Sequence, residues 1–265
     1  MPHDRADDVD GIRVLSAGAV ESIVAALASR FEAENGVRLH ISIARSRVVK
    51  QRASAGTDAD IVITTQAAID ELRAEGAVLT DSIATLAQSS IGIAIRSGSA
   101  APDLRSTADF TRLLRNVRSI AYADPDTGSP SGRYFTELLA RLGLTDMIAA
   151  KAIVIGPGKN DTVVVAEAVA DGRAEIGIQQ IAEILHVPGV VVAGPLPPEL
   201  QTVTAFTAAV TSTARCPEQA RRFIRFATSD AVAPIVTANG METPSHQKPT
   251  PKGETSQWPT DIIRS

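Results

Sequence analysis

Hydrophobic positions along this chain alternate between short apolar runs and apolar residues repeated at helical spacing. Apolar runs or strict alternation predict the strands, and spacings of three and four residues predict the helices. Strands are expected at 12–15, 36–44 and 59–65, each followed by a helix, at 20–35, 48–55 and 66–76. A regular succession of strand and helix is typical of a parallel sheet covered by helices on both faces.

The same succession continues through the middle of the chain. Strands are expected at 89–98, 119–124, 150–155, 174–180 and 201–212, and helices at 132–143, 162–172 and 216–230. A short helix and turn are expected at 182–189, followed by the apolar segment 190–194. The strands at 89–98 and 201–212 are unusually long and bracket the block between them. We interpret them as crossovers through which the chain enters and leaves a second lobe.

This interpretation divides the chain into two lobes. The first is expected to comprise residues 11–88 and 205–242, and the second residues 89–204. Residues 1–10 and 243–265 are polar and are expected to be flexible termini. The predicted architecture is α/β, with two lobes of mostly parallel sheet flanked by helices and a ligand cleft between the lobes.

Composition narrows the classes of function. Aromatic residues make up only 3% of the 265 residues and the net charge is −4, which argues against a nucleic-acid partner. The single cysteine, Cys216, excludes an intrachain disulfide, and the four histidines have no metal-ligand spacing. We therefore expect no metal and no cofactor. The N-terminus lacks an apolar signal segment, which predicts a cytoplasmic protein, or a periplasmic one if the start is misassigned or the signal removed.

Four predicted strand-to-helix junctions carry the small and polar residues that suit an anion. In open parallel sheets, ligands bind beyond the carboxyl ends of the strands, where backbone N–H groups of helix N-termini are free. The junctions lie at Ser16–Ala19, Ala44–Arg47, Ser131–Gly132 and Lys159–Thr162. Ser46, Ser131, and Asp161 or Thr162 could instead simply open or cap the following helices, as such residues ordinarily do.

Basic residues near these junctions support the interpretation that an anion binds there. Arg45, Arg47 and Arg133 lie so close to the turns that they could face a ligand, and a guanidinium matches a carboxylate with two hydrogen bonds. For Lys50 and Arg52 we favour a solvated surface role.

At this point the chain resembles a known family, the periplasmic solute-binding proteins of ABC transporters, most closely the molybdate-binding type. The resemblance covers about residues 11–242. The motifs that carry it are VLSAGAV, ADIVIT, AYADPDTGSPSGRYFTELLARLGL, AEIGI and TANG. It implies a two-lobe periplasmic-binding-protein-like fold of type II.

Only some of the residues that bind the oxyanion in that family are kept in this chain. The hydroxyl of the first helix falls on Ala19, near Ser16 and Gly18, while the hydroxyl of the second junction is kept as Ser46. The two amide donors of the second lobe fall on Ser131 and Thr162, and the family's tyrosine becomes Gln180. The junctions, the arginines beside them and the resemblance together give the expected ligand-binding residues: Ser16, Gly18, Ala19, Arg45, Ser46, Arg47, Ser131, Arg133, Thr162 and Gln180.

The missing hydroxyl and tyrosine, with arginines beside the site, favour a carboxylate over molybdate. EIGIQQIAEI and VLSAG resemble a divergent branch of the family that is similar to aconitate isomerase. The primary hypothesis is therefore a protein that binds a small di- or tricarboxylate or oxyanion. The alternative is an isomerase that shifts a proton along an allylic polycarboxylate, and a structural or protein-interaction role is third.

Catalytic residues and macromolecular partners are less defined by the sequence. Lys159, Asp161 and Tyr134 could serve as the base by position, and none is marked by spacing. The expected partner is a small anionic ligand, with an ABC permease only if the protein is exported. The chain is expected to be a monomer.

Overall fold

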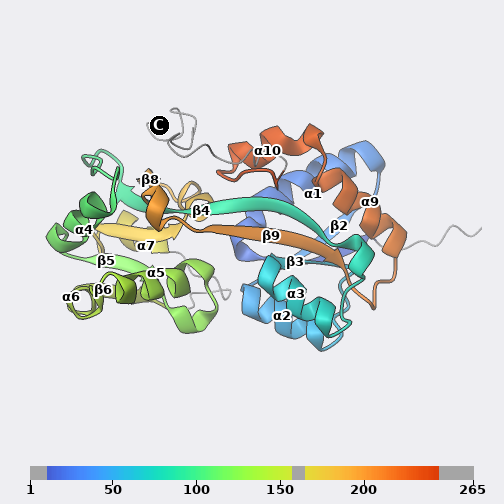
Figure 1. Ribbon diagram of the computed structural model, residues 1–265. Coiled ribbons are helices and arrows are strands. Elements are labelled where there is room, and N and C mark those ends of the chain that lie inside the picture. Colours follow the sequence, from blue (N-terminus) through green and yellow to red (C-terminus); the bar gives the residue numbers. More distant parts are fainter. Residues whose placement is uncertain (1–10, 157–164, 245–265) are drawn as a thin grey trace, which may run out of the picture. The chain divides into compact units, whose positions relative to one another are not determined.

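The computed structural model describes residues 11–156 and 165–244, which form two compact units (Figure 1). The first unit contains residues 11–86 and 206–235. The second contains residues 87–205, apart from 157–164, together with residues 236–244. Within the described residues, no helix is both long and apolar enough to cross a membrane.

The sheet of the first unit has the strand order β2-β1-β3-β9. Strands β1 (Ile12–Ala17), β2 (Leu39–Ala44) and β3 (Ile61–Thr65) are parallel, and β9 (Val203–Val210) runs antiparallel to β3. The residues of β1 and β3 are buried almost throughout, as is typical of strands with both faces covered.

Helices cover the two faces of this sheet in pairs (Figure 1). Helices α1 (Glu21–Asn35) and α9 (Pro217–Ala227) meet through Phe31 and Phe223, whose ring centroids are 5.3 Å apart. Helices α2 (Ser46–Ser54) and α3 (Gln66–Ala74) pack on the other face, where Val49 and Ile69 are fully buried. Short 3-10 turns lie at Gly18–Val20, Thr80–Ser82 and Asp230–Val232.

The second unit is built on strands in the order β4-β7-β5-β6, and β8 also pairs with β4. Strands β5 (Ile120–Ala123), β6 (Ala152–Ile155) and β7 (Ile176–Gln180) are parallel. Strands β4 (Ala84–Arg96) and β7 are antiparallel, as are β4 and β8 (Val190–Pro195). By residue number, β4 and β9 each belong partly to both units.

Two apolar clusters lie on opposite faces of the second sheet. One face packs against α4 (Thr107–Asn116), α5 (Pro130–Arg141) and α6 (Thr145–Ala149), through residues such as Phe110 and Phe135. The other packs against α7 (Val165–Ala170) and α8 (Ile181–Ile184), whose side chains contact the alanines of β4 and β5. Further 3-10 turns lie at Pro125–Thr127 and Pro198–Leu200.

The α/β architecture expected from the sequence is confirmed in each unit, with differences in detail. Helices α4 and α6 lie where the sequence analysis placed no element. Residues 236–242, expected in the first lobe, cluster with the second unit. The reason is that Gln88 and Glu242 exchange backbone hydrogen bonds of 2.8 and 2.9 Å, while Gly240 packs closely on Leu185. Helix α10 (Ala233–Ala238) therefore spans the division.

Candidate functional site

Two of the predicted junctions are neighbours in the first unit. Strands β1 and β2 are parallel and in register, with Ala17 opposite Ala44, so the residues after each strand emerge at the same edge of the sheet. Gly18 and Ala19 follow β1, and Arg45 to Arg47 follow β2. Gly18 and Ala19 are only partly buried, which leaves backbone near this edge accessible.

The second junction differs from the expectation in its cap. Arg45, not Ser46, is the N-cap residue of α2, with extended dihedral angles of φ −65° and ψ 148°. Ser46 is the first helical residue, and among the described residues no side chain caps this helix. The expectation that Ser46 caps α2 is wrong, because the helix begins one residue earlier than a Ser46 cap requires. Ser46 therefore remains a candidate for ligand contact.

The basic residues of α2 separate into two groups. Lys50 forms ion pairs with Glu71 (3.1 Å) and Glu75 (2.9 Å) of α3, so its charge is used between the two helices. Arg47 is exposed and Arg45 is partly buried, and both stand at the edge of the sheet where the helix begins.

Ser16, by contrast, lies inside β1 rather than in the turn. Its side chain is fully buried and its hydroxyl donates to the carbonyl of Ala17 at 3.3 Å. Ser16 is therefore not positioned in the turn as a replacement for the hydroxyl that Ala19 lacks.

In the second unit, the third junction is capped by Ser129. Its hydroxyl accepts from the backbone N–H of Gly132 at 3.5 Å and lies 3.2 Å from the hydroxyl of Ser131. Helix α5 begins at Pro130, one residue before Ser131, so Ser131 and Gly132 are its second and third residues and not its first two. Ser131 is fully buried in the first turn, and Arg133 is exposed beside it.

Gly132 is required for α5 to approach β5. A Cβ atom at Gly132 would lie 2.2 Å from the carbonyl oxygen of Ala123. The absence of a side chain thus brings the N-terminal turn of α5 onto the end of β5. The backbone N–H of Asp124 also donates to the carbonyl of Ile155 at 2.9 Å, which joins the ends of β5 and β6.

Of the three residues proposed as a possible base, the structure describes only Tyr134. The Tyr134 hydroxyl donates to the carbonyl of Leu200 at 2.6 Å and accepts from Arg141 at 3.0 Å, so its position is fixed by protein partners. Lys159 and Asp161 lie outside the described residues, as does Thr162 of the ligand set.

Gln180 ends β7 and faces inward. It is 1% exposed, and with its amide oriented so that both ends are satisfied it accepts from Thr204 (2.9 Å) and donates to the hydroxyl of Ser89 (3.0 Å). An anion at Gln180 would have to replace these hydrogen bonds.

Glu183, one turn beyond Gln180, was missed by the sequence analysis. Burial raises the pKa of Glu183 to about 7, although hydrogen bonds from the Gln179 side chain and the Gln180 backbone N–H lower it. The sequence does contain a signal for this environment. Glu183 lies three positions after the end of a predicted strand and is flanked by the apolar residues Ile181, Ala182 and Ile184. Such a position predicts a carboxylate at the start of a helix with a raised pKa.

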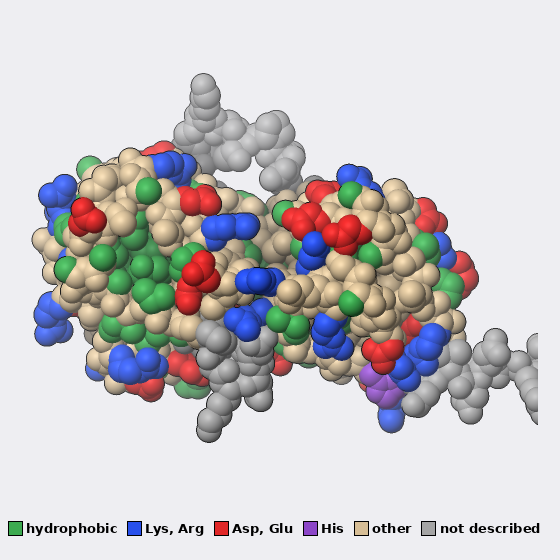
Figure 2. Space-filling view, turned by 90° about the horizontal axis from the view of Figure 1, so that it is seen from below, with side chains coloured by type: hydrophobic (Ala, Val, Ile, Leu, Met, Phe, Trp, Pro, Cys, Tyr) green, Lys and Arg blue, Asp and Glu red, His purple; other side chains and the backbone are tan. Residues whose placement is uncertain are grey.

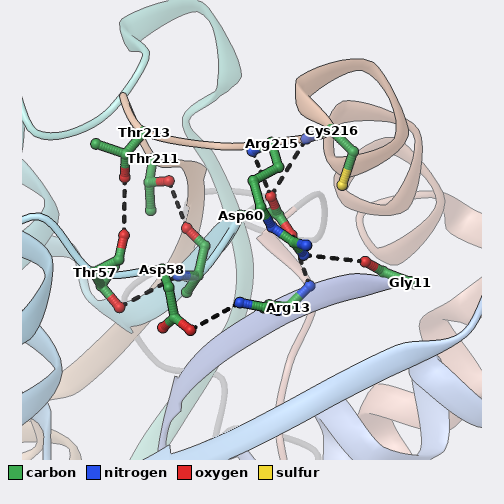
Figure 3. Close-up of polar contacts among 10 residues, drawn as sticks. Gly11, Arg13, Thr57, Asp58, Asp60, Thr211, Thr213, Arg215 and Cys216 are labelled. Carbon is green, nitrogen blue, oxygen red and sulfur yellow. Dashed lines mark hydrogen bonds and ion pairs between the residues drawn. The ribbon is translucent and has the colours of Figure 1, made fainter. Parts of the chain in front are cut away.

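A fully buried carboxylate, Asp60, lies at the other end of the first unit's strands from the junctions (Figure 3). It precedes β3 and accepts backbone hydrogen bonds from Arg13 (2.9 Å), Arg215 (2.7 Å) and Cys216 (3.3 Å), with the Arg215 guanidinium at 3.2 Å. All these donors come from the protein, which indicates a structural role.

Cys216 belongs to the same structural cluster. Burial, and then the neighbouring charge of Asp60, raise the pKa of the Cys216 thiol to about 11. A thiol that stays protonated at neutral pH is a poor nucleophile.

One face of the molecule carries charged side chains of both signs. On the face drawn in Figure 2, Lys or Arg and Asp or Glu side chains occur on each unit. In residues 11–156 and 165–244, no group of three or more His, Cys, Asp or Glu side chains could hold a metal ion.

Most of the chain is similar to known proteins. The family described as bacterial extracellular solute-binding proteins matches residues 12–242. Aconitate isomerase from a Pseudomonas species is 32% identical over 243 residues, covering 89% of each chain. The molybdate-binding protein ModA of Escherichia coli is 29% identical over 147 residues, which are 54% of this chain and 56% of ModA.

A solved structure supports the fold. The periplasmic molybdate-binding protein of Azotobacter vinelandii superposes with a TM-score of 0.71 at 22% identity, covering 88% of this chain and 99% of its own.

Proposed function

Because this chain belongs to the family of bacterial extracellular solute-binding proteins, we propose that it binds a small polycarboxylate anion at its strand-to-helix junctions. The observation that carries the proposal is the pair Arg45 and Arg47, which follows the carboxyl end of β2 and adjoins the Gly18–Ala19 turn. Solute-binding proteins of this family bind small ligands, and many work with an ABC permease.

Donors of two kinds support an anion in the first unit. Backbone N–H groups at the starts of the 3-10 turn after β1 and of α2 provide neutral donors, and the Ser46 hydroxyl provides another. Arg45 and Arg47 provide positive charge with a planar geometry that matches carboxylate oxygens. In the second unit, we propose Ser131 and Arg133 in the same role, because both lie in the first turn of α5.

The chemistry of these donors favours carboxylates over molybdate. Ala19 cannot provide the hydroxyl that the resemblance to molybdate-binding proteins implies at its position, and buried Ser16 bonds to Ala17 instead. A tricarboxylate carries several planar groups, each able to accept from a guanidinium, whereas a tetrahedral oxyanion is better held by neutral donors. The two arginines are thus explained by a carboxylate ligand.

Isomerisation of the bound ligand is a second candidate function. It is favoured by the relative at 32% identity over most of both chains, which is an aconitate isomerase. In this reaction the double bond of an unsaturated tricarboxylate would move by one carbon as a proton leaves one end of the allylic system and returns at the other. A transport receptor needs only to bind and release, so turnover separates the two candidates.

A thermal-shift panel tests the binding proposal. We expect trans-aconitate, cis-aconitate or citrate to raise the melting temperature, and molybdate, tungstate and sulfate to have smaller effects. Stabilisation by molybdate alone would overturn the polycarboxylate proposal. Incubation with trans-aconitate in deuterated water, followed by NMR, then shows whether cis-aconitate forms and whether deuterium enters the product.

A further inference from the structure

We propose that Glu183 is the group that carries the proton when this protein isomerises a bound unsaturated polycarboxylate. The inference rests on the second candidate function above and gives it the base that the sequence did not identify. It stands on the place of Glu183 in the second unit, on the hydrogen bonds that orient its carboxylate, and on the apolar residues around it.

Glu183 lies at the edge of the sheet where the anion-binding junction of the second unit is found. Strands β5 and β7 are parallel, so their carboxyl ends emerge at the same edge. Helix α8 follows β7 there, with Glu183 as its third residue. The turn that leads from β5 into α5 contains Ser129 and Ser131. A ligand at this edge would therefore meet both elements.

A short chain of hydrogen bonds orients the carboxylate. The backbone N–H of Ala166 in α7 donates to the side-chain oxygen of Gln179 at 3.1 Å, which leaves the amide nitrogen of Gln179 to donate to Glu183. The backbone N–H of Gln180 donates to Glu183 as well. Gln179 is 2% exposed, so this orientation is fixed by buried groups. Glu183 itself is only partly buried and keeps a path to the surface.

The environment of Glu183 suits reversible proton transfer near neutral pH. Its neighbours Ile181, Ala182 and Ile184 are buried, and desolvation of the Glu183 carboxyl raises its pKa to about 7. A carboxyl group with a pKa near the working pH can both take and return a proton.

Few charged groups belong to the elements packed against α8. Strands β7 and β8 contain no titratable residue, and α7 contributes Glu167. His186 follows α8, while Arg96 ends β4 and donates to the carbonyl of Val169. Helix α10 contains none, and Glu242 follows it. None of these residues is among the causes of the shift at Glu183, so its titration is governed by burial and hydrogen bonds.

The proton balance of the step is simple. The Glu183 carboxylate removes a proton from the methylene carbon of the ligand, and the C–H electron pair forms the new double bond. The electron pair of the old double bond then takes the proton back from Glu183 at the far allylic carbon. No oxidant, reductant or second substrate is needed, and Glu183 ends as the carboxylate with which it began.

The experiment compares Glu183→Gln with wild type, using trans-aconitate as the ligand. Glutamine keeps an oxygen that accepts from the Gln180 N–H but cannot carry the proton. We expect the rate of cis-aconitate formation to fall by about 10²–10⁴-fold, the usual contribution of a general base. Stabilisation by trans-aconitate should persist. Glu183→Asp should restore part of the rate, and Glu167→Gln, an exposed glutamate on the adjacent α7, should leave the rate unchanged.

The pH profile of wild type provides a readout that does not depend on any variant folding. We expect the turnover rate to rise with pH through an inflection near 7, as Glu183 ionises. A rate that is flat through this region, or a Glu183→Gln variant with an unchanged rate, would overturn the inference and leave isomerisation standing. A wild-type protein that binds trans-aconitate without isomerising it would overturn both, and binding alone would remain.

Discussion

The buried carboxylate of Asp60 faces the guanidinium of Arg215 at 3.2 Å and accepts the backbone N–H of the same arginine at 2.7 Å. Asp60 is fully buried, whereas the Arg215 side chain is 37% exposed. One residue therefore satisfies both oxygens of a charge that has no access to water. The contact joins the start of β3 to the segment between β9 and α9.

Replacing Asp60 by asparagine should destabilise the first unit strongly. The variant turns an amide N–H₂ toward backbone donors and leaves Arg215 without its partner. Breaking a buried pair in this way costs about 3–5 kcal/mol of unfolding free energy. Urea denaturation followed by circular dichroism measures the loss.

Asp58→Asn is the matched control for that variant. Asp58 pairs with Arg13 at 2.9 Å, but its side chain is 72% exposed. An exposed pair contributes about 0–1 kcal/mol, so the control should unfold nearly as wild type does. An equal loss of unfolding free energy in the two variants would show that the burial of Asp60 does not determine its contribution to stability.

Acid should weaken the same contact. Burial pushes the pKa of Asp60 upward, but hydrogen bonds from the backbone of Arg13 and Arg215 and the charge of Arg215 outweigh it and hold the pKa below 3.8. A lowered folded-state pKa stabilises the protein above the unfolded-state pKa, and this stabilisation is lost as pH falls through the folded-state value. The unfolding free energy of wild type should thus decline below about pH 4, and that of Asp60→Asn should decline less.

Glu183 should produce the opposite dependence. Its folded-state pKa of about 7 lies above the ordinary 4.5, so the folded protein binds this proton more tightly than the unfolded chain. Stability from this group is fully present below pH 4.5 and is lost as pH rises toward 7. Denaturation of wild type and Glu183→Gln between these pH values measures it, and parallel curves for the two proteins would contradict the assignment.

Arginine variants test the ligand class. Arg45→Ala or Arg47→Ala should weaken binding of trans-aconitate by about 1.5–3 kcal/mol, the value of a hydrogen bond to a charged group. Titration calorimetry measures the loss. Arg52→Ala, at an exposed position in the last turn of α2, is the control and should bind as wild type does. Unchanged binding in both test variants would show that Arg45 and Arg47 do not contact the ligand.

Gly132→Ala should disturb the start of α5. Its new methyl group would stand 2.2 Å from the Ala123 carbonyl oxygen, which cannot move without shifting β5. Overpacking of this kind costs roughly 1–3 kcal/mol of unfolding free energy. Gly76→Ala is no matched control because of its positive φ, whereas a methyl group at Gly156 meets no atom of residues 11–156 and 165–244 within 4 Å, so Gly156→Ala should be tolerated. Thermal denaturation of the two variants compares them directly.

Patterns of hydrophobic residues were sufficient to predict most of the strands and the α/β class. They failed at α4 and α6, because α4 buries only two residues, Phe110 and Leu114, and α6 has just five residues. Helix starts were also displaced at Ser46 and Ser131. A serine near a junction predicts a cap, but the cap residue depends on where the strand ends, and that is set by pairing with its neighbours.

The candidate site was only partly predictable. The junctions follow from chain order alone, because parallel strands must end at a common edge. The inward orientation of Gln180 depends on Ser89 and Thr204, which are distant in sequence, and the environment of Glu183 depends on Gln179 and on packing. Such contacts arise only when the chain has folded.

The long separation of Asp60 from Arg215 has a consequence for biosynthesis. The two residues are 155 positions apart, and the whole central block of the chain lies between them. At about 5–20 residues per second, a ribosome needs roughly 8–30 s to make that block. For most of this interval β1, β2 and β3 have been translated without β9, and for all of it the Asp60 carboxylate lacks Arg215 as its partner. The first unit therefore completes its sheet, with the addition of β9, only after most strands of the second unit have been synthesised.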